Sequence, residues 1–362
     1  MEDEEVDVLF TEILSGNPYH SLLFDELPSN VKTEEMERYR LFPLLRNVLR
    51  RDTDVVHYNW IHSYFFVYNF TGSKYVDAVF TAIFAVAFVI DALLVKMLGV
   101  RTVWTVHNKL NHERDYWRSE LLVNICLSRI VDVMTVKCSR AEETLGEVYR
   151  MSSTEKIRVV PDGNYIPVYP NTVTREEARN RLKIDEDEFV YLYFGVIREY
   201  KGVPELVKAY ENLNTTDSCL YIVGTPRSEH LKSYLSSASD ERDDIKTVLE
   251  YVPDEEVQMY MNAADVVVLP FRDVLNSGSV HLSMSFGKPV VAPSLGCIPE
   301  TVDESNRFLY SPEDENVLRE ILKKVRDVED LEQIGDANYA KAEKMTWEKS
   351  ARKYAEIYDS LT

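Results

Sequence analysis

Short runs of β-branched and apolar residues alternate with longer helical patterns along the whole 362-residue chain. In the first half, these runs predict buried strands at residues 6–12, 54–60, 101–107, 131–137 and 157–161. In the second half, they predict strands at residues 188–195, 219–224, 245–252, 265–270, 289–293 and 307–310. Strands that alternate with helices are typical of βαβ units, whose parallel sheets are covered by helices on both faces. The pattern therefore predicts an α/β protein.

A loop of prolines and turn-forming residues, at residues 161–172, interrupts the pattern between the two series of strands. It predicts a domain boundary and two doubly wound domains, at residues 1–165 and 166–345. The terminal segment, residues 346–362, carries apolar residues at helical spacing, so we expect it to pack on a domain. Because doubly wound sheets bind ligands beyond the carboxyl ends of their strands, we expect the site in a cleft between the domains.

One stretch, residues 78–90, is apolar except for a single threonine, and the apolar run resumes after Asp91. It is shorter than the ~20 residues that span a bilayer, and Asp91 would fall in the hydrocarbon. The pattern therefore favours a buried helix, with contact between residues 78–95 and a membrane surface as the second interpretation. Arg46, Arg50 and Arg51 on the preceding predicted helix could meet anionic lipid, or form an ordinary solvated face.

Charge and composition exclude several classes of protein. Hydrophobic residues make up 45% of the chain, which excludes a wholly disordered protein and leaves material for two packed cores. The net charge is −20, which argues against nucleic acid as a partner because phosphate neutralisation needs clustered Lys and Arg. The N-terminus is acidic where a secretion signal would be basic and then apolar. We therefore expect a cytoplasmic protein, at the inner face of the membrane if residues 78–95 contact lipid.

A candidate anion site follows the first predicted strand of the second half. Gly195 ends that strand, and Arg198 and Lys201 come within six residues of it. A glycine lets the backbone approach a ligand, while arginine offers a bidentate fork and lysine a point charge. Together they would suit a diphosphate. A turn with two solvated basic residues is the structural alternative.

A second candidate is the polar stretch that precedes a short helical pattern near residue 280. It consists of Asn276, Ser277, Gly278 and Ser279. A helix N-terminus has unpaired N–H groups and the positive end of the helix dipole, so a phosphate could bind there. An ordinary capped loop has the same composition, and the sequence leaves both interpretations open.

Polar side chains also gather at the carboxyl ends of two predicted strands in the first half. One group contains His107, Asn108, His112, Glu113 and Arg114, and the other contains His57, Asn59 and His62. Both groups are candidates for ligand binding, with buried, hydrogen-bonded histidines as the alternative. The spacing of His107 and His112 is not the i, i+4 pair of helical zinc sites, so we expect no metal site.

In combination, these segments resemble the family 4 glycosyltransferases of the GT-B fold, in which two Rossmann-like domains face each other across a cleft. The resemblance covers most of residues 188–361 and is carried by FGVIREYKG, LYIVG, YVPDEEVQMYMNAADVVVLPF, SGSVHLSMSFGKPVVAP and GCIPE. The closing TWEKSARKYAEIY is similar to the family's terminal helix, which crosses back to the first domain. The first half is similar more loosely, through NPYHSLLFDEL, DVVHYNWIH, TVHN and DGNYIPVYPN.

The resemblance implies transfer of a sugar from a nucleotide diphosphate donor to a glycan or lipid-linked saccharide. The second domain would bind the donor and the first domain the acceptor, without a metal or other cofactor. Most family members retain the anomeric configuration, so retention is expected. An inverting reaction would instead need a carboxylate base, with Glu113 or Asp115 as candidates.

Individual roles also follow from the resemblance. Arg198 and Lys201 match the family's diphosphate-binding cations, and Gly195 matches the glycine before them. The backbone at Tyr251 and Val252 matches the place where the family contacts the nucleotide base of the donor. Residues 276–279 match a loop that faces the donor's sugar and phosphates. His107 resembles the histidine of the first domain that approaches the donor sugar. The candidates on the acceptor side are His57, Asn59, Asn108, His112 and Glu113.

The sequence departs from the family at one pair of positions. The family's two glutamates, which hold sugar and ribose hydroxyls, would fall at Val274 and Leu282. Either neighbouring groups have taken over their role, or donor affinity has been lost; the neighbours are Asp273, Asn276, Ser279 and His281. The departure leaves two alternatives to a transferase: a catalytically silent homologue that serves as a partner subunit, and a nucleotide-sugar epimerase or phosphorylase.

Overall fold

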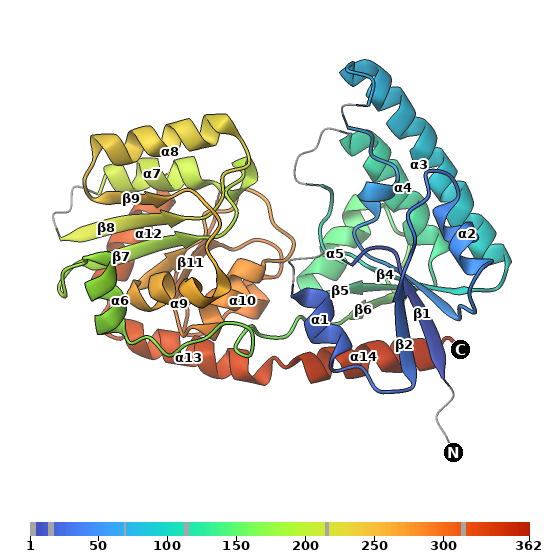
Figure 1. Cartoon of the computed structure of the whole chain (residues 1–362). Helices are drawn as coiled ribbons and strands as arrows, with labels where there is room; N and C mark the ends of the chain where they lie inside the picture. Colours follow the sequence, from blue (N-terminus) through green and yellow to red (C-terminus); the bar gives the residue numbers. More distant parts are fainter. Residues whose placement is uncertain (1–4, 14–17, 69, 112–115, 214–216, 313–315) are drawn as a thin grey trace. The chain divides into compact units, whose positions relative to one another are not determined.

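The computed structural model describes residues 5–362 except 14–17, 69, 112–115, 214–216 and 313–315. The chain divides into two compact units. One contains residues 1–162 together with 347–362, and the other contains residues 163–346. The chain therefore enters the second unit within the proline-rich loop and returns to the first unit for its last helix (Figure 1).

The first unit is built on a six-stranded parallel sheet in the order β2-β1-β3-β4-β5-β6. Its strands are β1 (Val6–Phe10), β2 (Val31–Glu35), β3 (Val55–Tyr58), β4 (Arg101–Thr105), β5 (Val133–Val136) and β6 (Ile157–Val159). Its helices are α1 (Tyr19–Phe24), α2 (Pro43–Val48), the 3-10 helix η1 (Ile61–Tyr64), α3 (Lys74–Met97), α4 (Trp117–Ile130), α5 (Ser139–Val148) and α14 (Trp347–Asp359).

The second unit has its own six-stranded parallel sheet, in the order β12-β11-β10-β7-β8-β9. Its strands are β7 (Phe189–Phe194), β8 (Ser218–Val223), β9 (Ile245–Val248), β10 (Val266–Val268), β11 (Val290–Pro293) and β12 (Leu309–Tyr310). The strands are joined by the 3-10 helix η2 (Glu199–Lys201), α6 (Arg175–Leu182), α7 (Val203–Glu211), α8 (Glu229–Glu241), α9 (Asp254–Ala263), α10 (Gly278–Ser285), α11 (Ile298–Thr301), α12 (Val317–Arg326) and α13 (Leu331–Lys344). The predicted α/β class with two doubly wound parallel sheets is confirmed.

The helix α14 contributes to the core of the first unit. Tyr354 and Tyr358 are completely buried, and the Tyr358 hydroxyl lies 2.6 Å from Nδ1 of His57 on β3. Near the start of the helix, the Ser350 hydroxyl donates a hydrogen bond to the Pro161 carbonyl. The last helix thus completes the core of a unit whose strands all lie in the first 162 residues.

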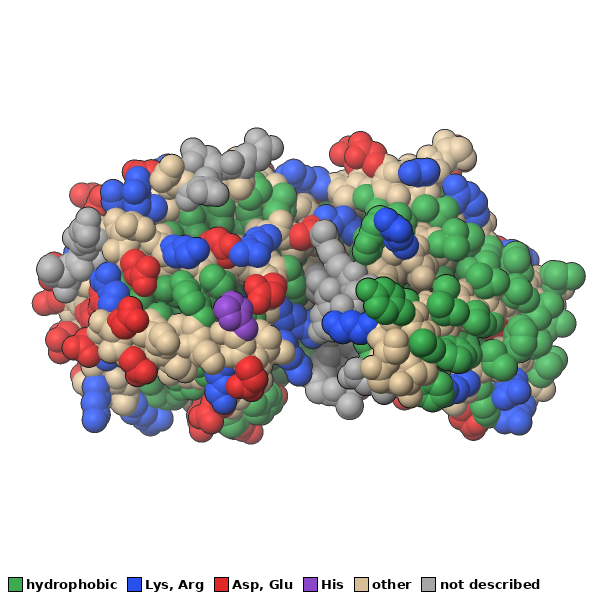
Figure 2. Space-filling model, turned by 90° about the horizontal axis from the view of Figure 1, so that it is seen from above, with side chains coloured by type: hydrophobic (Ala, Val, Ile, Leu, Met, Phe, Trp, Pro, Cys, Tyr) green, Lys and Arg blue, Asp and Glu red, His purple; other side chains and the backbone are tan. Residues whose placement is uncertain are grey.

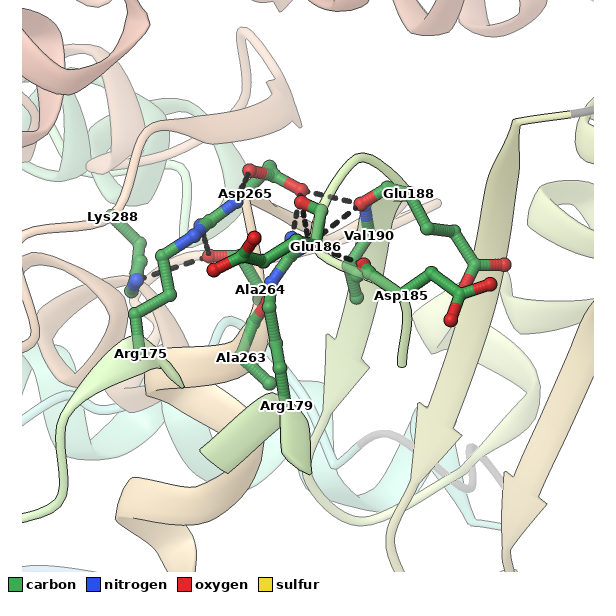
Figure 3. Close-up of polar contacts among 10 residues, drawn as sticks. All are labelled: Arg175, Arg179, Asp185, Glu186, Glu188, Val190, Ala263, Ala264, Asp265 and Lys288. Carbon is green, nitrogen blue, oxygen red and sulfur yellow. Dashed lines mark hydrogen bonds and ion pairs between the residues drawn. The ribbon is translucent and has the colours of Figure 1, made fainter. Parts of the chain in front are cut away.

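A buried arginine holds the amino-terminal edge of the second sheet together (Figure 3). The guanidinium of Arg179 donates to the carboxylate of Asp265 and to four backbone carbonyls, those of Ala263, Asp185, Glu186 and Glu188. Asp265 also accepts from the backbone N–H of Val190 on β7, at 2.7 Å. This network ties α6, the loop before β7 and the start of β10 at one point. The carboxyl ends of β7 and β10, at the opposite edge of the sheet, form the site described below.

Candidate functional site

The strand order of the second unit locates a ligand site between β7 and β10. The chain continues from β7 to β8 on one side, but β10 lies on the other side of β7. Ligands of doubly wound sheets bind beyond the carboxyl ends of strands at such a reversal. The loop after β7 runs close over the end of β10, because a Cβ atom on Gly202 would lie only 1.9 Å from the Pro270 carbonyl oxygen.

Two glycines allow the strand ends to come together here. Gly195 follows β7 with φ +131° and Gly224 follows β8 with φ +141°, both in the region that favours glycine. A Cβ atom on Gly224 would lie 2.0 Å from the Gly195 carbonyl oxygen, and one on Gly195 would lie 3.2 Å from Oγ of Ser279. The structure therefore brings together Gly195 and the polar stretch at residues 276–279, which the sequence had identified separately.

Lys201 lies in the same loop with its ammonium group against aromatic rings. Its Nζ is 4.7 Å from the ring centroid of Phe271 and 5.7 Å from that of Tyr200. Burial, and then the charge of Arg198, lower the pKa of Lys201 to about 8. No carboxylate of the described residues forms an ion pair with Lys201. Because a partly desolvated cation without a counterion is unfavourable, this arrangement is suited to an anionic ligand.

The polar stretch forms the N-terminus of α10. The Ser277 hydroxyl accepts a hydrogen bond from the Val280 N–H at 3.4 Å, so Ser277 is the capping residue. Gly278 is exposed, and a Cβ atom there would lie 3.2 Å from the Tyr165 hydroxyl. The first N–H groups of the helix and its positive dipole end therefore lie beside Gly195, where an anion would be stabilised.

The two positions that depart from the family are part of the apolar core. Val274 and Leu282 are 5% and 7% exposed, and both belong to the hydrophobic cluster of the second unit. Of the other residues matched to the donor, Tyr251 is 72% exposed beyond the end of β9, while Val252 is buried. These strand ends thus carry cations and backbone amides, with apolar side chains at the positions matched to the paired glutamates.

In the first unit, the corresponding reversal of strand order lies between β1 and β3. Asn59 directly follows β3 and is 1% exposed; its N–H donates to Oγ1 of Thr11, which follows β1. Its Oδ1 lies 2.9 Å from Nε2 of His107, which comes two residues after β4. An amide oxygen only accepts, so Nε2 carries the proton. His107 also stacks on Trp60, with 4.1 Å between centroids.

The surroundings of His107 favour its neutral form. Burial, and then the charges of Lys137, His20 and His57, hold the pKa of His107 well below its usual value. With the proton on Nε2, Nδ1 carries a lone pair. His107 therefore presents a neutral, fixed imidazole at the carboxyl edge of the first sheet.

The remaining candidates of the first unit fall in different places. His57 is completely buried, with Nδ1 bonded to Tyr358 and Nε2 2.7 Å from Oγ1 of Thr105, which favours the structural interpretation of this residue. Asn108 is half-buried next to His107. His112 and Glu113 lie outside the described residues.

Sequence reasoning missed two features at the same edge of the first sheet. A buried ion pair joins Lys137 and Asp162 at 2.7 Å, after β5 and β6, and Lys137 Nζ lies 4.7 Å from the ring centroid of Tyr19. His20 is 1% exposed, and neither ring nitrogen has a hydrogen-bond partner among the described residues. Burial, and then Lys137, lower its pKa to about 4. The available signal was a charged residue at the end of one predicted strand, Lys137, and another just beyond the next, Asp162.

Metal ligands are not assembled in the part of the chain that the structure describes. It contains no group of three or more His, Cys, Asp or Glu side chains that could hold a metal ion.

Comparison with known proteins agrees with this geometry. Residues 174–341, which lie within the second unit, match the family model for glycosyl transferases group 1. Over 318 residues, the chain is 27% identical to the GDP-mannose:glycolipid 4-beta-D-mannosyltransferase of Xanthomonas campestris pv. campestris, covering 86% of this chain and 80% of the relative. The chain is a glycosyltransferase, and its second unit carries the group 1 family domain. It is also 27% identical, over 55% of each chain, to the lipopolysaccharide 1,2-N-acetylglucosaminetransferase of Salmonella typhimurium.

Solved structures show that this glycosyltransferase has the GT-B fold. Anabaena Alr3699/HepE in complex with UDP-glucose superposes with a TM-score of 0.72 at 17% identity, covering 98% of this chain and 100% of that one. The sucrose-phosphate synthase of Thermosynechococcus elongatus superposes with a TM-score of 0.70 at 18% identity, covering 99% and 89%. The resemblance to GT-B glycosyltransferases found in the sequence is therefore confirmed.

Proposed function

We propose that this glycosyltransferase moves a sugar from a nucleoside diphosphate donor, bound by the second unit, to a saccharide acceptor bound by the first. One observation carries the donor assignment: the ammonium group of Lys201 lies near Arg198 and has no carboxylate partner among the described residues. A diphosphate would supply the missing negative charge. The names of two similar proteins support this choice, since one contains GDP-mannose and the other UDP-glucose.

In the proposed reaction, the bond between the anomeric carbon and the diphosphate oxygen breaks, and an acceptor hydroxyl oxygen bonds to that carbon. Negative charge develops on the departing diphosphate, where Arg198, Lys201 and the amides at the start of α10 would stabilise it. We propose that these groups make a metal ion unnecessary. We also propose retention, because the departing diphosphate can accept the proton of the acceptor hydroxyl, so that no carboxylate base is needed.

For the acceptor, we propose a glycan or a lipid-linked saccharide, handled in the cytoplasm at the inner face of the membrane. Two similar proteins are named for glycolipid and lipopolysaccharide acceptors. On the side of the first unit, we propose that His107 contacts the donor sugar as a neutral hydrogen-bonding group. Its fixed orientation against Trp60 and Asn59 supports that role.

The test is a panel of nucleotide sugars that includes GDP-mannose, UDP-glucose and UDP-N-acetylglucosamine. Calorimetry should detect binding of one donor, and prolonged incubation without acceptor should release its nucleoside diphosphate slowly. The double variant Arg198→Ala/Lys201→Ala should lose this binding, whereas Lys208→Ala, an exposed change on α7, should keep it. Failure of every uridine, guanosine and adenosine diphosphate sugar to bind would reject the proposal.

A second candidate function is a catalytically silent subunit, which the burial of Val274 and Leu282 favours. Such a protein would act on a partner enzyme, so the Arg198→Ala/Lys201→Ala variant would leave the cellular glycan unchanged. Donor turnover that needs inorganic phosphate, or that changes the sugar without releasing it, would instead identify a phosphorylase or an epimerase.

A further inference from the structure

The helix α3 of the first unit carries an exposed apolar face along its whole 24-residue length. Apolar residues that are 44–88% exposed recur every three or four positions, which places them on one side of the helix. We call this face the apolar stripe; it consists of Tyr75, Val79, Ile83, Val86, Ile90, Leu93 and Met97. Figure 2 shows hydrophobic side chains gathered on this side of the unit. Contiguous apolar surface of this kind marks an interaction site.

The two carboxylates of α3 point away from the stripe. Asp77 accepts hydrogen bonds from the backbone N–H groups of Phe70 and Thr71, at 3.2 and 3.0 Å. Asp91 is completely buried and accepts from the N–H groups of Leu44 and Leu45, at 2.7 and 2.9 Å. Both acidic side chains therefore fasten the helix to its own unit and leave the stripe uncharged.

The opposite face of α3 packs against the unit through Ala85, Phe88, Ala92 and Val95, all buried. The helix is long and apolar enough to cross a membrane, with a mean hydropathy of 2.6 in its most apolar 18-residue window, yet only 33% of that window is buried. A core helix of the same composition would be mostly buried. A helix held on one side and apolar on the other is suited to lie along a bilayer surface.

Arginine side chains on or just before α2 and α4, the two helices that contact α3, rest on aromatic rings. The guanidinium carbon of Arg40 is 4.5 Å from the ring centroid of Phe70, and that of Arg118 is 5.3 Å from Trp117. On the neighbouring α2, Arg46 lies 5.4 Å from the ring of Tyr39. None of these three arginines forms an ion pair with a carboxylate of the described residues. Paired aromatic and cationic side chains are typical of the headgroup region.

A cavity of about 400 Å³ lies beside the first half of α3 and continues the same chemistry. Phe84 of α3 lines it together with Phe70 and Tyr68, while Arg38 and Arg40 line its polar side. The cavity therefore has room for a phosphate-bearing headgroup beside Arg40, whereas Arg38 is already paired with Glu12.

We propose that the first unit docks on an anionic lipid bilayer through the apolar stripe, with Arg40, Arg46 and Arg118 among the headgroups. The net charge of −20 does not oppose this, because charges beyond a Debye length of ~8 Å are screened at physiological salt. A second copy of the chain is a less favourable occupant, because it would bring the same three arginines, and therefore like charge, to this surface. The inference deepens the proposed function, which places the acceptor at the membrane, but its test needs neither a donor nor turnover.

The test is cosedimentation of the whole chain with phosphatidylcholine vesicles, with and without phosphatidylglycerol. We expect binding to the anionic vesicles that weakens at high salt. Ile83→Glu/Ile90→Glu should abolish it, while Ser233→Glu/Ser237→Glu, the same charge change on α8 of the second unit, should not. Each of Arg40→Gln and Arg46→Gln should weaken partitioning by about fivefold at low salt.

Three results would overturn the proposal: no binding to anionic vesicles, equal binding of the Ile83→Glu/Ile90→Glu variant, or equal binding to both vesicle types. A concentration-dependent dimer that this variant abolishes would assign the stripe to a second copy. Far-ultraviolet circular dichroism and nucleotide-sugar binding of each variant provide the folding control. They also separate a failure of membrane docking from a failure of the donor assignment.

Discussion

The imidazole of His107 lies parallel to the indole of Trp60, with 4.1 Å between ring centroids and 7° between ring planes. The stack and the hydrogen bond to Asn59 fix the ring from two directions. We expect Trp60→Ala to lower kcat/KM by about 10²-fold, because small displacements of a positioned group have effects of this size. Steady-state kinetics with the best donor would measure it.

The control for this prediction is Trp60→Phe, which keeps an aromatic surface under the imidazole and should recover most of the activity. Donor binding, measured by calorimetry, should change less than kcat/KM in either variant, since the proposed diphosphate-binding cations belong to the second unit. A Trp60→Ala enzyme with unaltered kcat/KM would show that His107 needs no fixed orientation.

A second prediction concerns the pH dependence of donor binding. The pKa of Lys201 is lowered to about 8, so its positive charge is present below pH 8 and disappears as the pH rises through that value. We expect the association constant for the donor to fall up to tenfold per pH unit above pH 8. Lys201→Arg should move this fall to higher pH, because arginine remains charged. A donor affinity that is flat up to pH 10 would contradict the role of Lys201.

A third prediction compares two glycines with positive φ. Gly224→Ala would place a methyl group 2.0 Å from the Gly195 carbonyl oxygen, so we expect it to lower the free energy of unfolding by about 3 kcal/mol. We also expect it to weaken donor binding. Gly99→Ala has similar backbone strain, with φ +87°, but nothing within 4 Å of the new atom, and should cost about 1 kcal/mol. Urea unfolding of both variants measures the difference. Equal midpoints would mean that the strand ends at Gly195 and Gly224 can separate without cost.

A fourth prediction addresses the buried arginine in Figure 3. Arg179→Met leaves the carbonyls of Asp185, Glu186 and Glu188 without their donor, and we expect it to destabilise the second unit by about 3–5 kcal/mol. Arg181→Met, an exposed change on the same helix, should have little effect. Thermal unfolding compares the two. If both variants melt alike, the network at the amino-terminal edge does not stabilise the sheet.

The strands could be predicted from the sequence because most of them are buried on both faces and are therefore continuously apolar. The edge strand β2 was missed. Its sequence, VKTEE, has one buried residue out of five and carries Lys32, Glu34 and Glu35. It therefore contains no apolar run from which a strand could be predicted. Its pairing with β1 depends on backbone hydrogen bonds, which side-chain patterns do not reveal.

The candidate site was predictable only where its residues are close in sequence. Gly195, Arg198 and Lys201 share one loop, and residues 276–279 share one helix start, but their proximity depends on the order of β7 and β10. His57 was selected as a ligand-binding candidate, whereas its partner is Tyr358, which lies 301 residues away. A pairing of that range follows from tertiary packing and has no local signal.

The burial of α14 in the first unit affects the order in which the protein can fold. Ribosomes deliver the chain from its N-terminus, so residues 163–346 emerge before Tyr354 and Tyr358 are available. During synthesis, the unit that begins first is therefore completed last, and the side chains that α14 buries, such as His57, stay uncovered until residues 347–359 have emerged.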